Sequence, residues 1–573
     1  MISAAHKALI SSKSVALPTS FKMEVTTTGL SEVVTIVCGD TGTYNATINW
    51  GDGDPDSTIT TFNDADLAHT YAAIGSYDIE ITGDFNWVRY HNSINANSIT
   101  AILETPVGYA NPLTTLKEAF EDANNLTSIS ADFDTSGVAE WSAAFKQCHS
   151  LTSFPNLDFS SATQLGSNWG EGAWNTCTGL TSFPLIVIPV VTKMSGAWRS
   201  CTGLTSFPVL DVSSCQIFDS TWFGCSGLTT FPAIDFSHLT GNLGNTWGAC
   251  SGLTSFPAID FGSCTSWYTC WQDCTGLTSF PLLTSTSSLT NVRQAWEDCT
   301  GLTSFPLIDF SNVSNFDSAW RRCTGLTSFP IIDVSGEARL SQTWDGCSGL
   351  TSFPLIDCSG LTDHSTNYTW RDCTGLTSFP LLVLGGDRAQ GTWETCTGLT
   401  SFPLIDFTGY TYLRYCWREC SGLTSFPLIN TSSCSDFQET WNGCSSLTTF
   451  PLVDTSAGLS FIQTWRSCSS LTAFPACVFD AATRMDLTWN NCTNLATFPA
   501  NMFDNTLNTN FTDAFSGCAL TATSVNNILI SIDAAGQSNG TLDLDGGTSA
   551  APTGAGATAK AALITKGWTV TTN

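Results

Sequence analysis

One short phrase of sequence recurs along most of this chain, and that recurrence limits the possible folds more than any single residue does. Each unit approximates W-x-x-C-[T/S]-G-L-T-S-F-P-L-I-D-F-S, and most successive units begin 24 or 25 residues apart. A fixed period of roughly 20–50 residues indicates stacked coils, each contacting mainly its neighbours. The period therefore predicts a long scaffold, with any function on a repeated surface or at the two ends.

Seventeen units fit this frame when they are aligned on the aromatic residue that opens each one. Three residues later comes a cysteine in sixteen units, from Cys148 to Cys518, and Ala123 in the first. A leucine usually follows after three more residues, and then a Phe-Pro pair. The opening residues are Phe120, Phe145, Trp174, Trp198, Trp222, Trp247, Trp271, Trp296, Trp320, Trp344, Trp370, Trp393, Trp417, Trp441, Trp465, Trp489 and Phe515.

The spacing within a unit predicts its local structure. The segment L-T-S-F is short and lies between Gly and Pro, which suits a brief parallel strand that ends where Pro has no N–H to donate. The aromatic residue, Cys and Leu at steps of three predict a turn of helix or a 3₁₀-like bend that faces inward. One coil cannot bury these side chains alone, so stacking must bury them between neighbours.

Composition narrows the class of protein. Only 12% of the 573 residues are charged and 42% are hydrophobic, which predicts a surface rich in Ser, Thr, Asn and Gly. The net charge of −29 argues against nucleic acid or an anionic membrane as a partner. No run of 18 apolar residues occurs, so we expect no membrane-spanning helix. Residues 1–22 lack the apolar core of a secretion signal and are interpreted as an N-terminal arm.

The 24 cysteines could suggest a disulfide framework, but their placement favours a reduced packing column. Side chains at one repeat position point in parallel, whereas a disulfide needs converging Cβ vectors. Pairing of some cysteines remains an alternative. Zinc is disfavoured because Cys-x-x-Cys pairs are absent and only six histidines exist. Cys270 and Cys416 directly precede a repeat Trp, and we expect them near the surface.

A different domain precedes the repeats, over residues 23–98. The runs 33–37, 46–50 and 77–81 alternate like strands of an antiparallel sandwich. Within it come Trp50-Gly-Asp-Gly, then His69-Thr-Tyr71, then Gly75-Ser-Tyr77. This order resembles the signature of PKD domains. The resemblance implies a small immunoglobulin-like β-sandwich, found mostly in extracellular spacer or adhesion proteins, with no catalytic residues.

Three carboxylates in this domain could form a calcium loop. Asp52, Asp54 and Asp56 alternate along one turn, but the run lacks the Gly and terminal Glu of an EF-hand. A tight turn shaped by Asx hydrogen bonds is the alternative interpretation.

The repeats also resemble a known family. Phe145-Lys-Gln-Cys148-His-Ser-Leu151-Thr-Ser-Phe154 is similar to the unit of BspA-like leucine-rich repeats, although Trp replaces the usual Phe in the central units. The resemblance implies a right-handed solenoid of about 17 coils over residues 99–519. It also implies a cell-surface or secreted role in adhesion or structure, and related arrays occur in bacteriophage structural proteins.

After Cys518 the pattern stops, and residues 520–573 are expected to form a small α/β cap. Residues 524–532 predict a helix, residues 555–566 a second helix, and residues 568–572 a last strand. A terminal repeat needs its exposed face covered, which favours a capping role.

Residues that could carry chemistry are few. No nucleophile–base motif, phosphate-binding loop or metalloprotease motif occurs, and His149, His238 and His364 lie in different units as expected surface variations. Nine units place Asp seven residues after the repeat Leu, and stacking would align these carboxylates in a row. Asx turns are one interpretation and a cation-binding stripe is the other. The nine are Asp158, Asp211, Asp235, Asp260, Asp309, Asp333, Asp357, Asp406 and Asp454.

These observations predict a mostly β, non-enzymatic protein that needs no cofactor, apart from possible calcium. Modules of extracellular type combined with reduced cysteines suit a virion protein, which folds in a reducing cytosol and leaves the cell by lysis. The leading hypothesis is a phage tail fibre, spike or capsid decoration at the virion surface. It would contact other structural proteins through its N-terminal region and could bind a host glycan or protein or form homo-oligomers. The alternatives are a bacterial adhesin or extracellular filament subunit, and a depolymerase that uses the acidic row.

Overall fold

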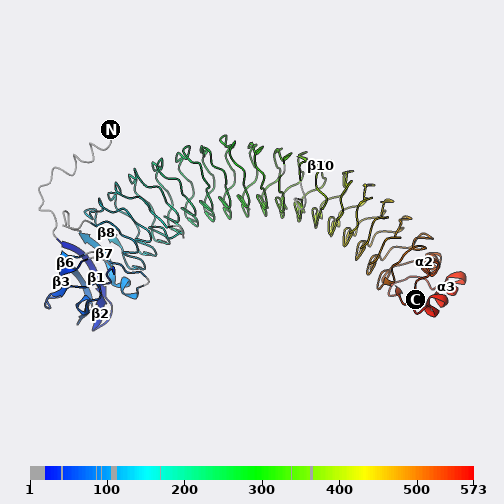
Figure 1. The fold of residues 1–573 in the computed structure, drawn as a ribbon, viewed down its shortest axis with the longest axis horizontal. Coiled ribbons are helices and arrows are strands. Elements are labelled where there is room, and N and C mark those ends of the chain that lie inside the picture. Colours follow the sequence, from blue (N-terminus) through cyan, green and yellow to red (C-terminus); the bar gives the residue numbers. More distant parts are fainter. Residues whose placement is uncertain are drawn as a thin grey trace. The chain divides into compact units, whose positions relative to one another are not determined.

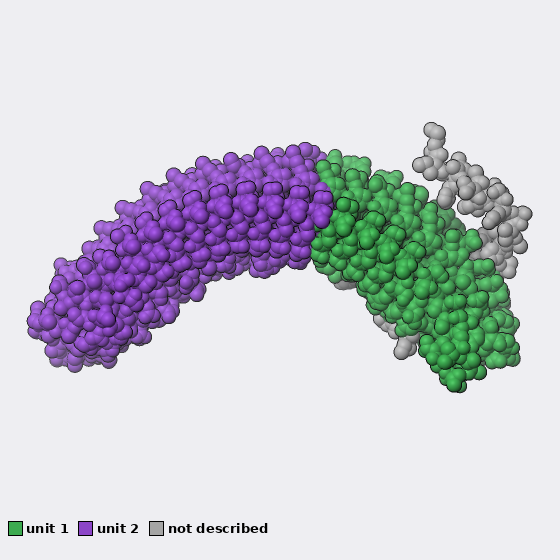
Figure 2. Space-filling view, turned by 180° about the vertical axis from the view of Figure 1, so that it is seen from behind, with its two compact units in different colours: residues 1–253, 257–262 green, residues 254–256, 263–573 purple. Residues whose placement is uncertain are grey.

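The computed structural model describes residues 20–40, 43–85, 87–91, 93–104, 113–167, 170–336, 338–361 and 366–573. Most of the expected N-terminal arm, residues 1–22, lies outside the described residues. The chain divides into two compact units, which are coloured in Figure 2. Unit 1 comprises residues 1–253 with 257–262, and unit 2 comprises residues 254–256 with 263–573.

Unit 1 begins with two mainly antiparallel sheets, and the three predicted strand runs are confirmed as strands of them. The larger sheet has the order β4-β3-β6-β1-β7-β8, and β2 pairs with β5 in the smaller one. Alternate residues point inward, so that Met23 and Val25 of β1 and Ile79 and Ile81 of β6 are fully buried. The elements are β1 (Ser20–Thr27), β2 (Glu32–Thr35), β3 (Asn45–Asn49), β4 (Ser57–Ile59), 3₁₀ helix η1 (Ala65–Leu67), β5 (Ala68–Tyr71), β6 (Gly75–Asp84), η2 (Ile94–Ser98), β7 (Ile99–Glu104) and β8 (Ser128–Ile129).

The larger sheet continues into the first repeat. Strand β7 lies beyond the expected domain boundary at residue 98, yet it pairs antiparallel with β1 and parallel with β8 of the first unit. The amide of Thr127 donates to the carbonyl of Thr100 at 2.9 Å, and that of Ser130 to Ile102 at 2.7 Å. The N-terminal region therefore covers the edge that the first coil would otherwise expose.

Around most repeat aromatic residues, the backbone donates three hydrogen bonds to the next coil of its unit. In unit 2 the amides of Ser318, Trp320 and Arg322 donate to carbonyls of the following coil at 2.9, 2.9 and 2.7 Å. Within the coil, the Cys323 amide donates to the Trp320 carbonyl at 3.1 Å, which closes a 3₁₀-like turn. Figure 1 shows the resulting row of coils in each unit.

The expected helical turn is interrupted by left-handed residues. Ser318 and Arg322, two residues before and after Trp320, both have φ near +58°. Most coils repeat this pair, with Gly at Gly346 or Gly391 and with other residue types elsewhere. Each left-handed non-glycine residue costs about 1 kcal/mol or more. The alternation turns every second amide toward the next coil, so the hydrogen bonds between coils offset that cost.

The repeat tryptophans form a stacked column at the centre of the coils. In unit 2, from Trp271 to Trp489, successive ring centroids lie 5.3–5.8 Å apart with interplanar angles of 3–8°. The rings of Phe305 and Phe329 meet Trp320 edge-on at 5.1 and 4.8 Å. Parallel offset and edge-on pairs are the favoured aromatic geometries, so the column adds to the burial of these rings.

The cysteines form a second column, and they act as hydrogen-bond donors. All 24 cysteines lie among the described residues, and all are buried thiols without disulfides, which confirms the predicted reduced column. The Cys323 thiol donates to the Trp296 carbonyl at 3.0 Å, and the Cys347 thiol to the Trp320 carbonyl at 3.1 Å. Burial raises the pKa of Cys225 to about 12.

Cys270 and Cys416 are fully buried, and the expectation that they lie near the surface is wrong. Their repeat position, just before Trp, holds Thr in most neighbouring coils. There the Thr440 hydroxyl donates to the Leu413 carbonyl at 2.9 Å, and the Cys416 thiol makes the equivalent bond to Ala389 at 2.8 Å. The position is therefore an internal donor site rather than a surface site.

The L-T-S-F segments are extended but form little regular sheet. Most contribute a single rung, such as the Thr327 amide to the Thr303 carbonyl at 3.2 Å. The only two-residue pair between coils of unit 2 is that of β9 (Asp357–Cys358) with β10 (Val383–Leu384), among the residues the structure describes. The predicted strand is shorter than expected because the following Pro supplies no donor.

The end of the chain covers the last coil, as the sequence predicts. Both predicted helices and the last strand are confirmed as α2 (Ala522–Ala534), α3 (Gly554–Thr565) and β13 (Thr569–Thr572). Strand β12 (Thr541–Leu544) pairs parallel with β11 (Asn510–Phe511) and with β13. The Gly517 amide of the last coil donates to the Asp545 carbonyl at 3.2 Å. Within the described ranges, no helix is long and apolar enough to cross a bilayer.

We predict that the native protein, prepared without oxidation, shows almost no rapidly reacting thiol. After denaturation without reductant, all 24 cysteines should react, because each thiol is buried but unpaired with another sulfur. Titration with a chromogenic disulfide reagent, before and after denaturation, measures both numbers. A shortfall after denaturation that a reductant restores would reveal disulfides and contradict the thiol column.

Candidate functional site

The nine repeat aspartates all close Asx turns. In each, the Oδ1 atom accepts the backbone N–H of the residue two positions later, at 2.8–3.1 Å. In two of these turns a serine hydroxyl donates a second hydrogen bond to the aspartate of its own turn: Ser335 at 2.7 Å and Ser456 at 2.6 Å. The Asx-turn interpretation is therefore confirmed, and each carboxylate has a structural role at the end of an extended segment.

These bonds also keep the carboxylates charged. Backbone and side-chain hydrogen bonds from Ser311 lower the pKa of Asp309, and those from Ser359 lower the pKa of Asp357. The hydroxyl and amide of Thr408 do the same for Asp406. The carboxylates of Asp309, Asp357 and Asp406 are therefore ionised at neutral pH.

The predicted cation stripe is not gathered into a multidentate cluster. Among the described residues, the one group of three or more ligand side chains whose ligating atoms lie within 4.8 Å of one another is Asp52, Asp54 and His69. Asp211, Asp235, Asp260, Asp309, Asp333 and Asp357 lie outside it, one to a coil. Binding of a cation by this row stays a prediction.

The N-terminal cluster brings together two of the three predicted carboxylates and one histidine that the sequence did not assign as a ligand. The Nε2 atom of His69 lies 2.7 Å from Oδ2 of Asp52, and the Asp54 amide donates to Oδ1 of Asp52 at 3.1 Å. Partial burial would raise the pKa of Asp52, but these hydrogen bonds lower it. Asp56 does not join the cluster, because it accepts a bond from Asn49 at 2.8 Å.

The three motifs of this domain form one contact network. The ring of His69 stacks on Trp50 at 4.9 Å, and Tyr71 stacks on Tyr77 at 4.2 Å. The Tyr71 hydroxyl donates to the Trp50 carbonyl at 2.8 Å. The packing of the strands therefore accounts for these motif residues.

The remaining predicted histidines do not assemble into a site. His149 contacts the Thr178 hydroxyl at 3.0 Å, and His238 contacts the Cys215 carbonyl at 2.7 Å. Each bond joins one coil to a neighbouring coil. His364 lies outside the described residues.

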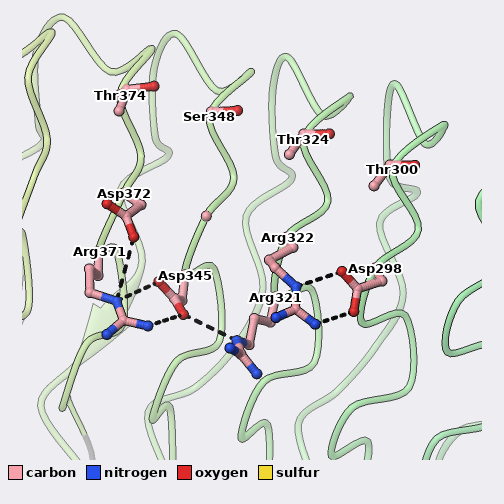
Figure 3. A pocket seen from close by; sticks show the side chains of 11 residues that line it. Asp298, Thr300, Arg321, Arg322, Thr324, Asp345, Ser348, Arg371, Asp372 and Thr374 are labelled. Atoms are coloured by element: carbon pink, nitrogen blue, oxygen red, sulfur yellow. Dashed lines mark hydrogen bonds and ion pairs between the residues drawn. The ribbon is translucent and has the colours of Figure 1, made fainter.

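Unit 2 carries a ladder of alternating charges at the position directly after the repeat Trp, which sequence reasoning missed. Arg321 lies 3.0 Å from Glu297. Arg321 also lies 3.2 Å from Asp345, and Arg371 lies 2.7 Å from Asp345 (Figure 3). Arg418 lies 3.3 Å from Glu394. Six consecutive coils thus alternate in sign, and an alternation at one repeat position could have been found in the sequence.

The acidic members of the ladder are more buried than the arginines. The side chains of Glu297 and Asp345 are 3% exposed, whereas that of Arg321 is 26% exposed. The hydrogen bonds that Arg371 donates to Asp345 raise the pKa of Arg371, so that its guanidinium stays charged. Burial outweighs the attraction of Arg418 and raises the pKa of Glu394. The arginines of the ladder therefore offset the desolvation cost of carboxylates that would be unfavourable to bury without a partner.

A shallow depression of about 510 Å³ opens beside this ladder. Its charged side chains already pair with one another, and its hydroxyls come from the turn after each Cys (Figure 3). The arrangement has no exposed nucleophile–base pair among its lining residues and suits a structural role better than a catalytic one. The lining residues are Asp298, Thr300, Arg321, Arg322, Thr324, Asp345, Gly346, Ser348, Arg371, Asp372 and Thr374.

The solved structures that are similar to this chain include two leucine-rich repeat proteins. No family model matches the chain, and no curated protein matches it. A leucine-rich repeat protein from Bacteroides ovatus is 16% identical over 77% of this chain and 92% of its own, with a TM-score of 0.28. A leucine-rich repeat protein from Eubacterium ventriosum is 14% identical over 62% of this chain and 91% of its own, with a TM-score of 0.30.

At these TM-scores the superpositions carry no argument about this chain. The chain is a mostly non-helical repeat array with one buried leucine in most coils, as its own hydrogen bonds and buried columns show.

We predict that Asp345→Asn lowers the free energy of unfolding by about 1–3 kcal/mol, because Arg321 and Arg371 would then share no carboxylate between them. The matched control is Asp309→Asn, whose exposed Asx turn an amide can also close and which should change stability by less than about 0.5 kcal/mol. Urea unfolding followed by tryptophan fluorescence measures both. Equal effects of the two substitutions would contradict the compensating role of the ladder.

Proposed function

We propose that this protein is a non-enzymatic scaffold, built from a PKD-like domain and BspA-like leucine-rich repeats, that serves as a virion structural or surface-appendage protein. A tail fibre, a spike or a capsid decoration would each fit. The repeat coils would space or present a surface, and the N-terminal region would contact other structural proteins.

The observation that carries the proposal is the thiol column. Cys323, Cys347 and their equivalents use the S–H group as a donor to a backbone carbonyl of the preceding coil, so the folded coils need reduced cysteine. Reduced cysteines in these numbers suit folding in a reducing cytosol. The exposed Thr and Ser of the L-T-S-F segments suit exposure outside the cell. A particle assembled in the cytosol and released by lysis reconciles the two.

The second candidate is a bacterial surface adhesin or extracellular filament subunit. The coverage of the last coil by the segment around Asp543 and Asp545 argues against end-to-end filaments, because the amides of Phe515 and Gly517 are already bonded within the chain. An adhesin would need an export route compatible with reduced cysteines.

We predict that the protein co-purifies with phage particles. Lysates of the native source, treated with nuclease and separated on a density gradient, would be analysed by quantitative mass spectrometry beside a washed cell-envelope fraction. Enrichment with capsid and tail proteins at constant stoichiometry is the expected result. Enrichment in the envelope fraction, with none in particles, would favour the adhesin instead.

A further inference from the structure

Unit 2 exposes an uninterrupted row of large aliphatic side chains. The residue after the repeat Phe-Pro pair is 56–64% exposed in eight consecutive coils. Single exposed leucines are ordinary, but a row with one member per coil forms a continuous apolar strip. The row comprises Leu282, Leu307, Ile331, Leu355, Leu381, Leu404, Leu428 and Leu452.

The backbone places aspartates beside this row. In an extended segment successive side chains alternate between faces, so Leu307 and Asp309 point outward while Ile308 is 1% exposed. Five of the eight coils have Asp at this second outward position: Asp309, Asp333, Asp357, Asp406 and Asp454. We call the two rows together the leucine–aspartate face.

The leucine–aspartate face and the turn around each Trp differ in the charges that they carry. None of the eight segments that run from the repeat Leu to the Asp position, such as 302–309 and 350–357, contains Lys or Arg. The arginines of unit 2 that flank the tryptophans, such as Arg321 and Arg371, are paired within the charge ladder. The leucine–aspartate face therefore carries negative charge and no cationic side chain of its own.

The extent of the face matches that of a specific protein interface. Eight aliphatic side chains at this exposure offer roughly 100 Å² each, or roughly 800 Å² in total. A stable interface of standard size buries about 800 Å² on each partner. The strip also exceeds the largest apolar patch of about 300–600 Å² on a typical monomer.

The spacing of the coils is close to the pitch of an α-helix. At the phenylalanine column, two residues before the leucine row, neighbouring ring centroids lie 5.7–6.2 Å apart. An α-helix advances about 5.4 Å per turn, so one apolar residue per turn can meet one leucine per coil.

We propose that the leucine–aspartate face of unit 2 docks an amphipathic α-helix of another protein, whose apolar stripe contacts the leucine row and whose flanking Lys or Arg side chains contact the aspartate row. A second copy of this chain is the weaker candidate, because it would bring another acidic row and its own net charge of −29. The inference does not depend on where the protein resides, since it concerns a surface and the chemistry of its partner.

The probe is a synthetic helix of about 28 residues with one leucine stripe flanked by lysines, which spans about eight coils. Two control peptides replace its leucines by serine at constant charge, or its lysines by glutamate at constant apolarity. Binding to the full chain is measured by fluorescence anisotropy. The expected result is saturable one-to-one binding of the probe and at least about tenfold weaker binding of both controls.

Variants of the full chain locate the site. L307S/L355S/L404S should weaken binding of the probe at least about tenfold, whereas the matched control S304A/S352A/S401A changes neighbouring exposed positions of the same coils and should alter it less than about twofold. D309N/D357N/D406N should weaken binding and reduce its dependence on salt. Near-UV circular dichroism checks that all variants keep the native fold, as expected for exposed positions.

Three results would overturn the proposal. The first is equal binding by the leucine variant and the wild type. The second is loss of binding in the serine-to-alanine control but not in the leucine variant. The third is a wild-type dimer in analytical ultracentrifugation that the leucine variant dissociates, because a second copy of this chain would then occupy the face.

Discussion

The backbone hydrogen bonds that join coil to coil around each repeat tryptophan are the interaction on which the rest of the structure depends. They form because residues such as Ser318 and Arg322 adopt a left-handed conformation on either side of Trp320, which turns alternate amides toward the next coil. Once coils are held in this register, equivalent side chains fall into columns. Each column then stabilises the same register again, so stability accumulates along the stack.

The columns differ in how strictly each one requires a particular type of side chain. Phe120, Phe145 and Phe515 replace Trp near the ends of the repeat series, and the indole N–H of Trp320 is buried without a hydrogen-bond acceptor among the described atoms. The aromatic column therefore depends on ring area and stacking rather than on the indole N–H. The cysteine column depends on a small donor, because each thiol reaches a carbonyl of the preceding coil. The charge ladder around Arg321 links neighbouring coils in the same way, with ion pairs between opposite charges in place of the hydrogen bond from thiol to carbonyl.

Features that depend on the period of the side chains could be predicted from the sequence, whereas features that depend on backbone handedness could not. The buried Leu326, the reduced Cys323, the Asx turn of Asp309 and the terminal helices were predictable because each rests on spacing or on local hydrogen bonding. The left-handed positions were missed because residues other than Gly occupy most of them. Gly346 and Gly391, at the same repeat positions, were the available signal. Cys416 was misplaced because its position directly before Trp does not reveal that side chains there, such as Thr440, donate to a carbonyl of the preceding coil.

The measurement that tests the central claim most directly is native-state hydrogen exchange of backbone amides, resolved by mass spectrometry along the chain. If the coils are joined as described, the amides of the repeat aromatic residue and of the residues two positions before and after it will exchange slowly. That protection should recur every 24 or 25 residues through each unit, as the sequence period does. Rapid exchange at these positions, or protection that does not follow the period, would contradict the hydrogen-bonded stack.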